Sequence, residues 1–306
     1  MTSSRRLPAA HGTGLWNGPL GLLDQHLAPQ RLLTRAMQRL TRVRAPWFKD
    51  RQIRWFIQRY QVDMSAAVEP NPAAYVDFND FFTRALRPAA RPVASEPDAV
   101  ACPVDGTVSQ LGDVEHDRLL QAKGRHYQLA ALLGGSPARA AEFLRSRYVT
   151  LYLSPRDYHR VHMPIAGRLR EMAYVPGRLF SVSPRTTRGI PSLFARNERL
   201  ITVFDTEIGP MAVILVGAML VAGMETVWSG AIPHATQPQE WRYGAGEVQL
   251  DRGAELGRFN MGSTVILLFP PDKVELAAAL APGAPVRMGE RLAAMLESGD
   301  HVSTGE

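Results

Sequence analysis

Cysteine is almost absent from this sequence, because Cys102 is the only one among 306 residues. A single thiol excludes an intrachain disulfide and a zinc site built from cysteines. We therefore expect the chain to work in a reducing compartment. We also expect no secretory signal, because Arg5 and Arg6 are not followed by an apolar stretch.

A long hydrophobic run is missing as well. The longest apolar stretch, MAVILVGAMLVAGM from Met211 to Met224, falls short of the roughly 18 residues expected of a spanning helix. Its β-branched residues and glycines instead predict buried strands. If the protein meets a membrane, we expect it to lie on the surface.

Acidic residues are scarce near the amino terminus, where Asp50 is the only one between Gln30 and Tyr60. The whole chain carries a formal net charge of +6. This balance favours an anionic partner such as nucleic acid, lipid or a phosphate-bearing substrate. No nucleic-acid motif is recognisable, so we expect no nucleic acid partner.

The basic segment has the spacing of two helices. From Gln30 to Arg44, apolar residues follow one helical face and arginines the other, and a second helix is predicted after Ala45-Pro46. Trp47 and Trp55 lie among its cations, a pattern typical of helices at an anionic membrane surface. The alternative is an ordinary helix pair that packs on the core and exposes a basic face.

Composition divides the chain into two regions. Residues 1–90 are predicted to form a helical, basic, membrane-associating region, and residues 91–306 a β-rich catalytic domain. Within that domain we expect short strands over residues 95–270, then a short helix, a turn and a disordered polar tail. The predicted fold class is α+β, an antiparallel β-rich core preceded by amphipathic helices.

Two turns in the β-rich region share the form Pro-x-x-Gly-x-aliphatic. They cover residues 103–108 and residues 164–169, and a looser relative covers residues 282–290. Repeated glycine turns between short apolar runs predict duplicated β units. The alternative is that such turns are common in any β protein.

Two segments carry candidate acid and base groups. Asp105 lies in the first of these turns, where an Asp most often makes only local hydrogen bonds. His159 and His162 are three residues apart, but the Glu of the zinc motif and a third ligand are missing. We therefore favour separate acid and base roles over a metal pair and expect no metal.

Gly262-Ser263-Thr264 opens a strand-like apolar run. A hydroxyl there commonly bonds to the backbone of a turn. The chemical alternative is a peptide bond that rearranges, because Gly262 leaves its carbonyl open and Ser263 can attack it once a base removes its proton. Asp105, a histidine and Ser263 would then form a charge-relay triad.

Taken together, these segments resemble bacterial phosphatidylserine decarboxylase, a pyruvoyl-dependent family. The resemblance covers about residues 75 to 280 and rests on blocks that occur in order: FNDFFTRALRPAARP, PVDGTVSQLG, LSPRDYHRVHMPIAG, LFSVSPRTTRGIPSLFARNERL, FDTEIGPMAVILVGA and GRFNMGSTVILLFPPDKV. Met261 stands where many relatives carry Leu, a swap that nearly conserves volume.

The resemblance implies a role for each matching residue. Asp105, His162 and Ser263 would drive cleavage of the Gly262–Ser263 bond without hydrolysis, giving a β chain (residues 1–262) and an α chain (residues 263–306). Ser263 would become the covalent pyruvoyl cofactor, which forms a Schiff base with the amine of phosphatidylserine. His159 is the candidate proton donor, and the product would be phosphatidylethanolamine.

The family also implies a setting, namely a peripheral enzyme on the cytoplasmic face of the cell membrane, and relatives suggest a homodimer of αβ units. The residues that hold the substrate's carboxylate and phosphate are not ranked, although Arg156, Arg196 and Arg199 are candidates. Three alternatives stay open: a serine hydrolase that uses the same triad uncut, a membrane-binding module with a vestigial site, and a metal-dependent lyase at the two histidines.

Overall fold

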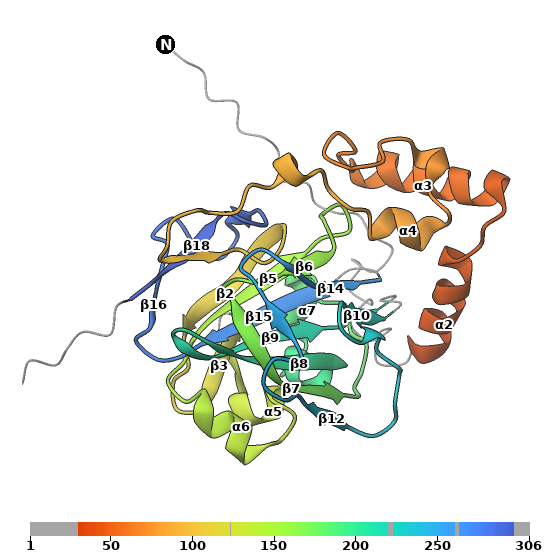
Figure 1. The fold of residues 1–306 in the computed structure, drawn as a ribbon. Coiled ribbons are helices and arrows are strands. Elements are labelled where there is room, and N and C mark those ends of the chain that lie inside the picture. Colours follow the sequence, from red (N-terminus) through yellow and green to blue (C-terminus); the bar gives the residue numbers. More distant parts are fainter. Residues whose placement is uncertain (1–29, 123, 220–222, 261–262, 297–306) are drawn as a thin grey trace, which may run out of the picture.

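The computed structural model describes residues 30–296 apart from residue 123, residues 220–222 and residues 261–262. Helices of the amino-terminal region lie to one side of a β-rich body (Figure 1). They are α2 (Gln30–Thr41), α3 (Pro46–Tyr60) and α4 (Phe78–Phe82), with 3-10 turns η1 (Pro72–Ala74) and η2 (Pro88–Ala90). The two predicted basic helices are thus confirmed.

The ends of α3 follow from its sequence. Pro46 occupies the first turn, where its missing N–H costs nothing, and the helix ends at Gln61 in the left-handed conformation. Ile53 and Phe56 of α3 pack with Phe78, Phe81 and Phe82 of α4 in a small cluster separate from the main core. The helical region therefore has apolar packing of its own.

The central sheet has the order β12-β7-β8-β9-β15-β5-β2-β17, and β13 also pairs with β7. Its strands are β2 (Gly106–Asp113), β5 (Arg147–Leu153), β7 (Gly167–Val175), β8 (Arg199–Thr206), β9 (Gly209–Val216), β12 (Gln239–Arg242), β13 (Gln249–Leu250), β15 (Ser263–Phe269) and β17 (Pro285–Val286). All pairings in this sheet are antiparallel. Every residue of β15 is buried, because strands flank it on both sides and both faces are covered.

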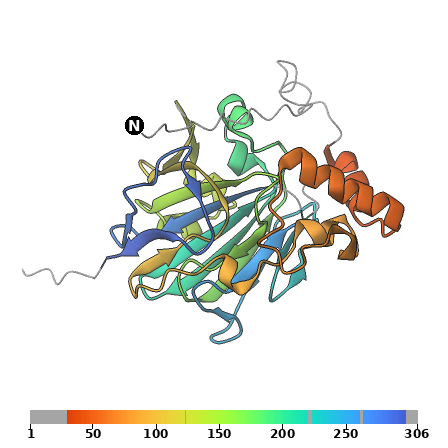
Figure 2. The ribbon, with the colours of Figure 1, turned by 90° about the horizontal axis from the view of Figure 1, so that it is seen from above.

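Smaller units surround this sheet, as Figure 2 shows from above. One sheet has the order β11-β10-β14-β6, another the order β1-β18-β16, and β3 pairs with β4. Their strands are β1 (Ala99–Ala101), β3 (Arg118–Ala122), β4 (Arg125–Gln128), β6 (Arg160–His162), β10 (Met224–Thr226), β11 (Gly230–Ala231), β14 (Glu255–Phe259), β16 (Val274–Leu276) and β18 (Arg291–Met295). Short helices α5 (Leu129–Leu132), α6 (Pro137–Glu142), α7 (Pro184–Gly189) and α8 (Leu193–Arg196) complete the body.

The α+β class with an antiparallel core is confirmed. Both predicted Pro-x-x-Gly turns lead into strands, since β2 begins at Gly106 and β7 at Gly167. The apolar run from Met211 begins in β9, which ends at Val216, and its last residue, Met224, begins β10, so buried strands occur in it as predicted. In the described part of the chain no helix is long and apolar enough to cross a membrane.

Two secondary-structure predictions were wrong. Residues 271–296 contain no helix; β16, β17 and β18 lie there instead, because pairing of Val274–Leu276 with β18 overrides the helical preference of the alanines that follow. Helices α5 to α8 were not anticipated between the strands. The predicted polar tail lies outside the described residues.

Candidate active site

Three candidate segments meet at the end of β5. Ser263 pairs with Leu153 on one side of β5, and Thr107 pairs with Tyr152 on the other. A Cβ on Gly106 would lie 2.4 Å from the Tyr152 carbonyl oxygen, so only glycine allows the Asp105 turn to approach so closely. Because neighbouring strands lie about 4.8 Å apart, the start of β2 and the start of β15 are separated by two strand spacings.

The histidine segment joins this end of the sheet from β6. The His162 backbone N–H donates to the Pro103 carbonyl at 2.9 Å, two residues before Asp105. The Phe259 N–H donates to the His159 carbonyl at 3.0 Å, four residues before Ser263. The fold therefore gathers the Asp105, histidine and Ser263 segments, which lie up to 158 positions apart in the sequence.

Ser263 is the first residue of β15 and is fully buried. Its Oγ has no hydrogen-bond partner within the described part of the chain. A buried hydroxyl without a partner is uncommon, because it gives up its bonds to water without replacement. The other half of the predicted cleavage site, Gly262, lies outside the described residues.

His162 is held by both ring nitrogens. Nδ1 lies 2.8 Å from the Gly253 carbonyl oxygen, which can only accept, so Nδ1 carries the proton of the neutral ring. Nε2 is then the acceptor for the Tyr158 hydroxyl at 3.0 Å. Burial lowers the pKa of His162, although the Gly253 bond and the charges of Glu255 and Asp105 oppose this shift. At neutral pH the ring is therefore an uncharged base.

Asp105 makes different bonds from those predicted. Arg91 donates to both carboxylate oxygens, with Nε 2.9 Å from Oδ1, and the Met288 backbone N–H donates to Oδ1 at 2.9 Å. Among the described residues Asp105 has no hydrogen bond to His162, and its influence on that ring is electrostatic. In this state the Gly253 carbonyl fixes the tautomer of His162. Orientation of His162 by Asp105 during self-cleavage stays a prediction.

His159 is completely buried against the ring of Phe82, with the ring centroids 4.1 Å apart. Its Nδ1 donates to the Asp157 carbonyl at 2.8 Å, and its Nε2 has no partner among the described residues. Burial, with a contribution from the charge of Arg84, lowers the pKa of His159 to about 3. The ring is therefore neutral at physiological pH in this state.

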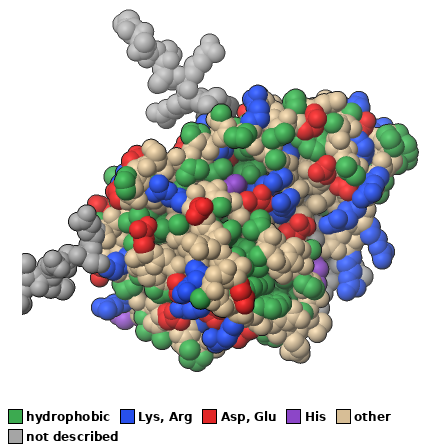
Figure 3. Space-filling view, in the orientation of Figure 1, with side chains coloured by type: hydrophobic (Ala, Val, Ile, Leu, Met, Phe, Trp, Pro, Cys, Tyr) green, Lys and Arg blue, Asp and Glu red, His purple; other side chains and the backbone are tan. Residues whose placement is uncertain are grey.

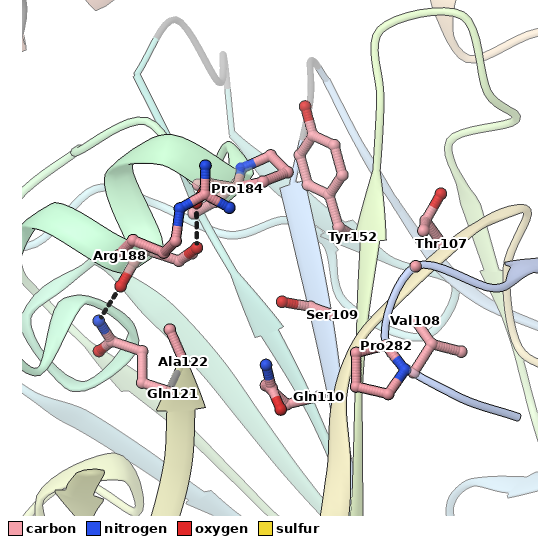
Figure 4. A pocket seen from close by; sticks show the side chains of 13 residues that line it. Thr107, Val108, Ser109, Gln110, Gln121, Ala122, Tyr152, Pro184, Arg188 and Pro282 are labelled. Atoms are coloured by element: carbon pink, nitrogen blue, oxygen red, sulfur yellow. Dashed lines mark hydrogen bonds between the residues drawn. The ribbon is translucent and has the colours of Figure 1, made fainter. Parts of the chain in front are cut away.

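A pocket of about 360 Å³ opens beside the same end of the sheet (Figure 4). Hydroxyl and amide side chains line it, including Thr107, Ser109 and Gln110 of β2, and Arg188 of α7 lies at its wall. Tyr152 also lines the pocket and pairs with Thr264. Because side chains alternate along β5, Tyr152 and the pocket lie across the sheet from the Leu153 and Ser263 side chains.

The comparisons with known proteins decide the family. A sequence model described as phosphatidylserine decarboxylase matches residues 78–294, and a second model, described as PSD, matches residues 20–61. Proteins named phosphatidylserine decarboxylase proenzyme from Bordetella pertussis and Pseudomonas aeruginosa are each 55% identical over 278 residues. Those alignments cover 90% of this chain and 94% and 96% of the relatives. The chain belongs to the phosphatidylserine decarboxylase family. It is thus a carboxy-lyase that acts on phosphatidylserine, as the sequence predicted.

The arginines proposed to hold the decarboxylase substrate differ in their surroundings. Arg199 is buried and donates to four backbone carbonyls, those of Ala131, Leu132, Ala195 and Asn197. Arg196 lies over the Phe180 ring and donates to the Pro191 carbonyl. The Arg156 side chain is 62% exposed. Four of the five N–H donors of Arg199 are therefore committed to the backbone, and this residue braces the fold.

Sequence reasoning missed several residues of the decarboxylase site. Tyr158 stands inside the quoted histidine block, and Arg91 inside the quoted FNDFFTRALRPAARP block, so both were available as polar neighbours. Gly253 and Met288 contribute only a backbone carbonyl and a backbone N–H, so their side-chain types give no indication of these contacts. Only the fold could reveal those two contacts.

Proposed function

We propose that the chain cuts itself between Gly262 and Ser263 and decarboxylates phosphatidylserine with the pyruvoyl group formed from Ser263. The observation that carries this proposal is the buried Ser263 Oγ at the start of β15, which has no partner among the described residues and lies at the same sheet end as Asp105 and His162. The relatives are named proenzymes, which supports processing of the chain.

Self-cleavage proceeds by an acyl shift followed by elimination. His162 Nε2 takes the Ser263 hydroxyl proton, and Oγ bonds to the Gly262 carbonyl carbon. The C–N bond then breaks as His162 returns the proton to the nitrogen, which leaves an ester and a free amine. Loss of the Ser263 α-proton then breaks the ester C–O bond, leaving a carboxylate on Gly262 and dehydroalanine at 263. Water replaces the amine, ammonia leaves, and a ketone remains at the new amino terminus.

The neutral state of His162 suits it to act as the base. Gly253 holds the proton on Nδ1, so the lone pair of Nε2 is the one available, once the Tyr158 hydroxyl gives way. The nearby Asp105 charge stabilises the imidazolium that forms, as a buried carboxylate does in a charge-relay triad. Arg91 and Met288 keep that carboxylate in place.

When present, the pyruvoyl group supplies a conjugated carbonyl that accepts the electrons left behind by carbon dioxide. The chain's own residues must then deliver a proton to the product. His159 is our candidate, because it is buried near the start of β15 and its Nε2 has no partner among the described residues.

The intact mass of the purified protein tests self-cleavage. We expect two chains, residues 1–262 and 263–306, and a mass at position 263 that corresponds to pyruvoyl. Ser263→Ala should stay a single chain without activity. Thr264→Val is the matched control, because it removes the neighbouring buried hydroxyl, which also has no partner among the described residues, and should still cut. One uncut chain that decarboxylates its substrate, or labelling of Ser263 by a fluorophosphonate, would point to the hydrolase alternative instead.

We further propose that residues 1–90 hold the enzyme on an anionic membrane. Trp47 and Trp55 are 78% and 57% exposed, and Leu33 and Leu40 on the predicted apolar face of α2 are exposed as well. Lysine and arginine side chains gather around α2 and α3 in Figure 3. Exposed aromatic side chains among cations match a helix that lies in the headgroup layer.

Flotation with liposomes tests this anchor. Trp47→Ser combined with Trp55→Ser should weaken binding to vesicles that contain anionic lipid. Leu144→Ser is the control, because Leu144 is 45% exposed but lies outside the helical region. Equal flotation of both variants and the wild type would reject the anchor.

We keep two expectations of the family as proposals, a homodimer of cut units and a place on the cytoplasmic face. Light scattering of the detergent-solubilised enzyme measures the first. Protease accessibility of the chain in inverted compared with right-side-out membrane vesicles measures the second, and digestion only in inverted vesicles is the expected result.

A further inference from the structure

Arg84 differs from the other buried arginines of the described chain. Arg84, Arg139 and Arg199 are 5%, 4% and 3% exposed. Arg139 donates to Glu171, Glu240 and the Leu133 carbonyl, and Arg199 donates to backbone carbonyls with all three of its nitrogens. In contrast, Nε and Nη1 of Arg84 are buried without any partner among the described residues.

The surroundings of Arg84 do not supply the missing acceptors. Among the described residues its guanidinium makes one hydrogen bond, from Nη2 to the Arg156 carbonyl at 3.3 Å. The guanidinium lies 5.5 Å from the centroid of the Phe81 ring, a contact that leaves the in-plane N–H groups unused. A buried charge without hydrogen-bonded partners is costly, and arginine keeps its charge even though burial lowers its pKa.

Nearby carboxylates are committed to other donors. Asp63 accepts from the Ser65 N–H, Asp105 from Arg91 and Met288, and Asp157 from Ser154. Their charges stabilise the Arg84 cation from a distance but do not accept hydrogen bonds from it. The surrounding negative charge therefore stabilises the Arg84 cation, while Nε and Nη1 keep their hydrogen-bond donors without a partner among the described residues.

Arg84 also lies at the active site. Arg156, whose carbonyl it contacts, follows Leu153 by three positions, and Leu153 pairs with Ser263. The preceding residue, Thr83, accepts from Arg160 at 2.9 Å, and Phe82 packs on His159. The segment from 82 to 84 thus links helix α4 to the histidine segment, between the proposed membrane anchor and the reacting residue.

We propose that Arg84 is the anion-binding residue of the active site, whose free N–H groups bind an anionic oxygen group of the phospholipid headgroup beside His159. The inference rests on the proposed function and adds the residue that recognises the substrate. Phosphatidylserine carries two such groups, a phosphodiester and a carboxylate, and guanidinium N–H donors suit both.

An anion on Arg84 has a consequence for His159. In the structure the charge of Arg84 adds to burial in keeping the His159 ring unprotonated. A bound anion would offset that charge and stabilise the imidazolium. Substrate binding would then remove the smaller of the two influences that lower the pKa of His159, and burial would remain as the larger.

The test separates substrate binding from self-cleavage. Arg84→Gln and Arg84→Lys are first checked by intact mass, and the cut fractions are assayed with phosphatidylserine in detergent mixed micelles. We expect both variants to form the cut enzyme. KM should rise about 10- to 100-fold for Arg84→Gln, as for loss of a charged hydrogen bond, and less for Arg84→Lys, which keeps the charge but loses the planar donor set.

The control is Arg147→Gln. Arg147 makes a surface pair with Asp113 at the far end of β5. This variant therefore also loses a guanidinium, but one that is already paired and lies away from the site, and it should keep the wild-type KM. Inhibition by phosphatidylethanolamine identifies the group bound. Weaker product inhibition in the variants assigns Arg84 to the phosphate, whereas unchanged product inhibition with a raised KM assigns it to the carboxylate.

A cut Arg84→Lys enzyme and a cut Arg84→Gln enzyme with wild-type KM would overturn the inference while leaving self-cleavage intact. If Arg84→Gln fails to fold, as judged by its thermal melting, the Arg84→Lys enzyme decides alone, and an unchanged KM then rejects the anion site. Failure of the wild type to cut would instead refute the proposed function on which the inference rests.

Discussion

Acid should destabilise the uncut chain through one buried imidazole, that of His159. Its pKa falls from the ordinary 6.5 to about 3 in the folded protein, because the ring is fully buried. Below pH 6.5 the unfolded chain therefore binds a proton at this site that the folded chain does not. Stability from this group is complete above pH 6.5 and is lost progressively as the pH falls towards 3.

The size of the effect follows from the two pKa values. At pH 5, 1.5 units below the unfolded pKa of 6.5, protonation of His159 in the unfolded chain lowers the free energy of unfolding by about 2 kcal/mol relative to pH 8. That is a large share of the roughly 5–15 kcal/mol by which folded domains are stable. Other groups titrate in the same range, so the contribution of His159 must be isolated by difference.

Urea unfolding of the Ser263→Ala precursor at pH 8 and pH 5 provides the assay, with and without His159→Gln. The substitution should flatten the pH dependence by about 2 kcal/mol, whatever it does to stability at pH 8. His126→Gln is the control, because His126 is exposed, and it should retain the full dependence. Equal pH dependence with and without His159 would refute the buried, neutral ring.

Three further predictions concern the sheet and the base. Gly106→Ala should cost about 1–3 kcal/mol in urea unfolding and slow self-cleavage, because its Cβ would lie 2.4 Å from the Tyr152 carbonyl oxygen; unchanged values would show that β2 can move away. The rate of self-cleavage, followed by gel after a pH jump, should be constant from pH 7 to 8 and fall only below pH 6.5, because the pKa of His162 is lowered and its neutral form is the base. A fall centred above pH 6.5 would contradict that assignment. Leu267→Ala in the fully buried β15 should destabilise the precursor by about 2–5 kcal/mol in the same unfolding assay, and a loss below 1 kcal/mol would mean that the strand is less tightly packed.

Local sequence patterns predicted the elements that position the site. The β-branched run after Ser263 indicated a buried strand, and the Pro-x-x-Gly segments indicated turns between short strands, after which β2 and β7 begin. Proline at 46 marked the start of a helix. These signals work because backbone preferences and apolar burial act over a few residues.

Contacts between distant segments were not predictable in the same way. The bond from His162 to the Gly253 carbonyl joins positions 91 residues apart and uses a backbone group that every residue has. The lack of partners for Nε and Nη1 of Arg84 among the described residues is a property of its burial, which the quoted block FNDFFTRALRPAARP does not encode. The short helices α5 to α8 were missed because four to six residues are too few to show a helical period.

The central place of β15 has a consequence for how such an enzyme could be made. Its neighbours β5 and β9 both belong to the stretch before residue 263, so a break at that point would leave two polypeptides interleaved within one sheet. The shorter piece could not leave without opening hydrogen bonds along both edges of its first strand. If the two pieces were synthesised separately, β15 would have to insert between β5 and β9 after those strands had formed their other pairings. We therefore expect the single precursor to fold before it is divided.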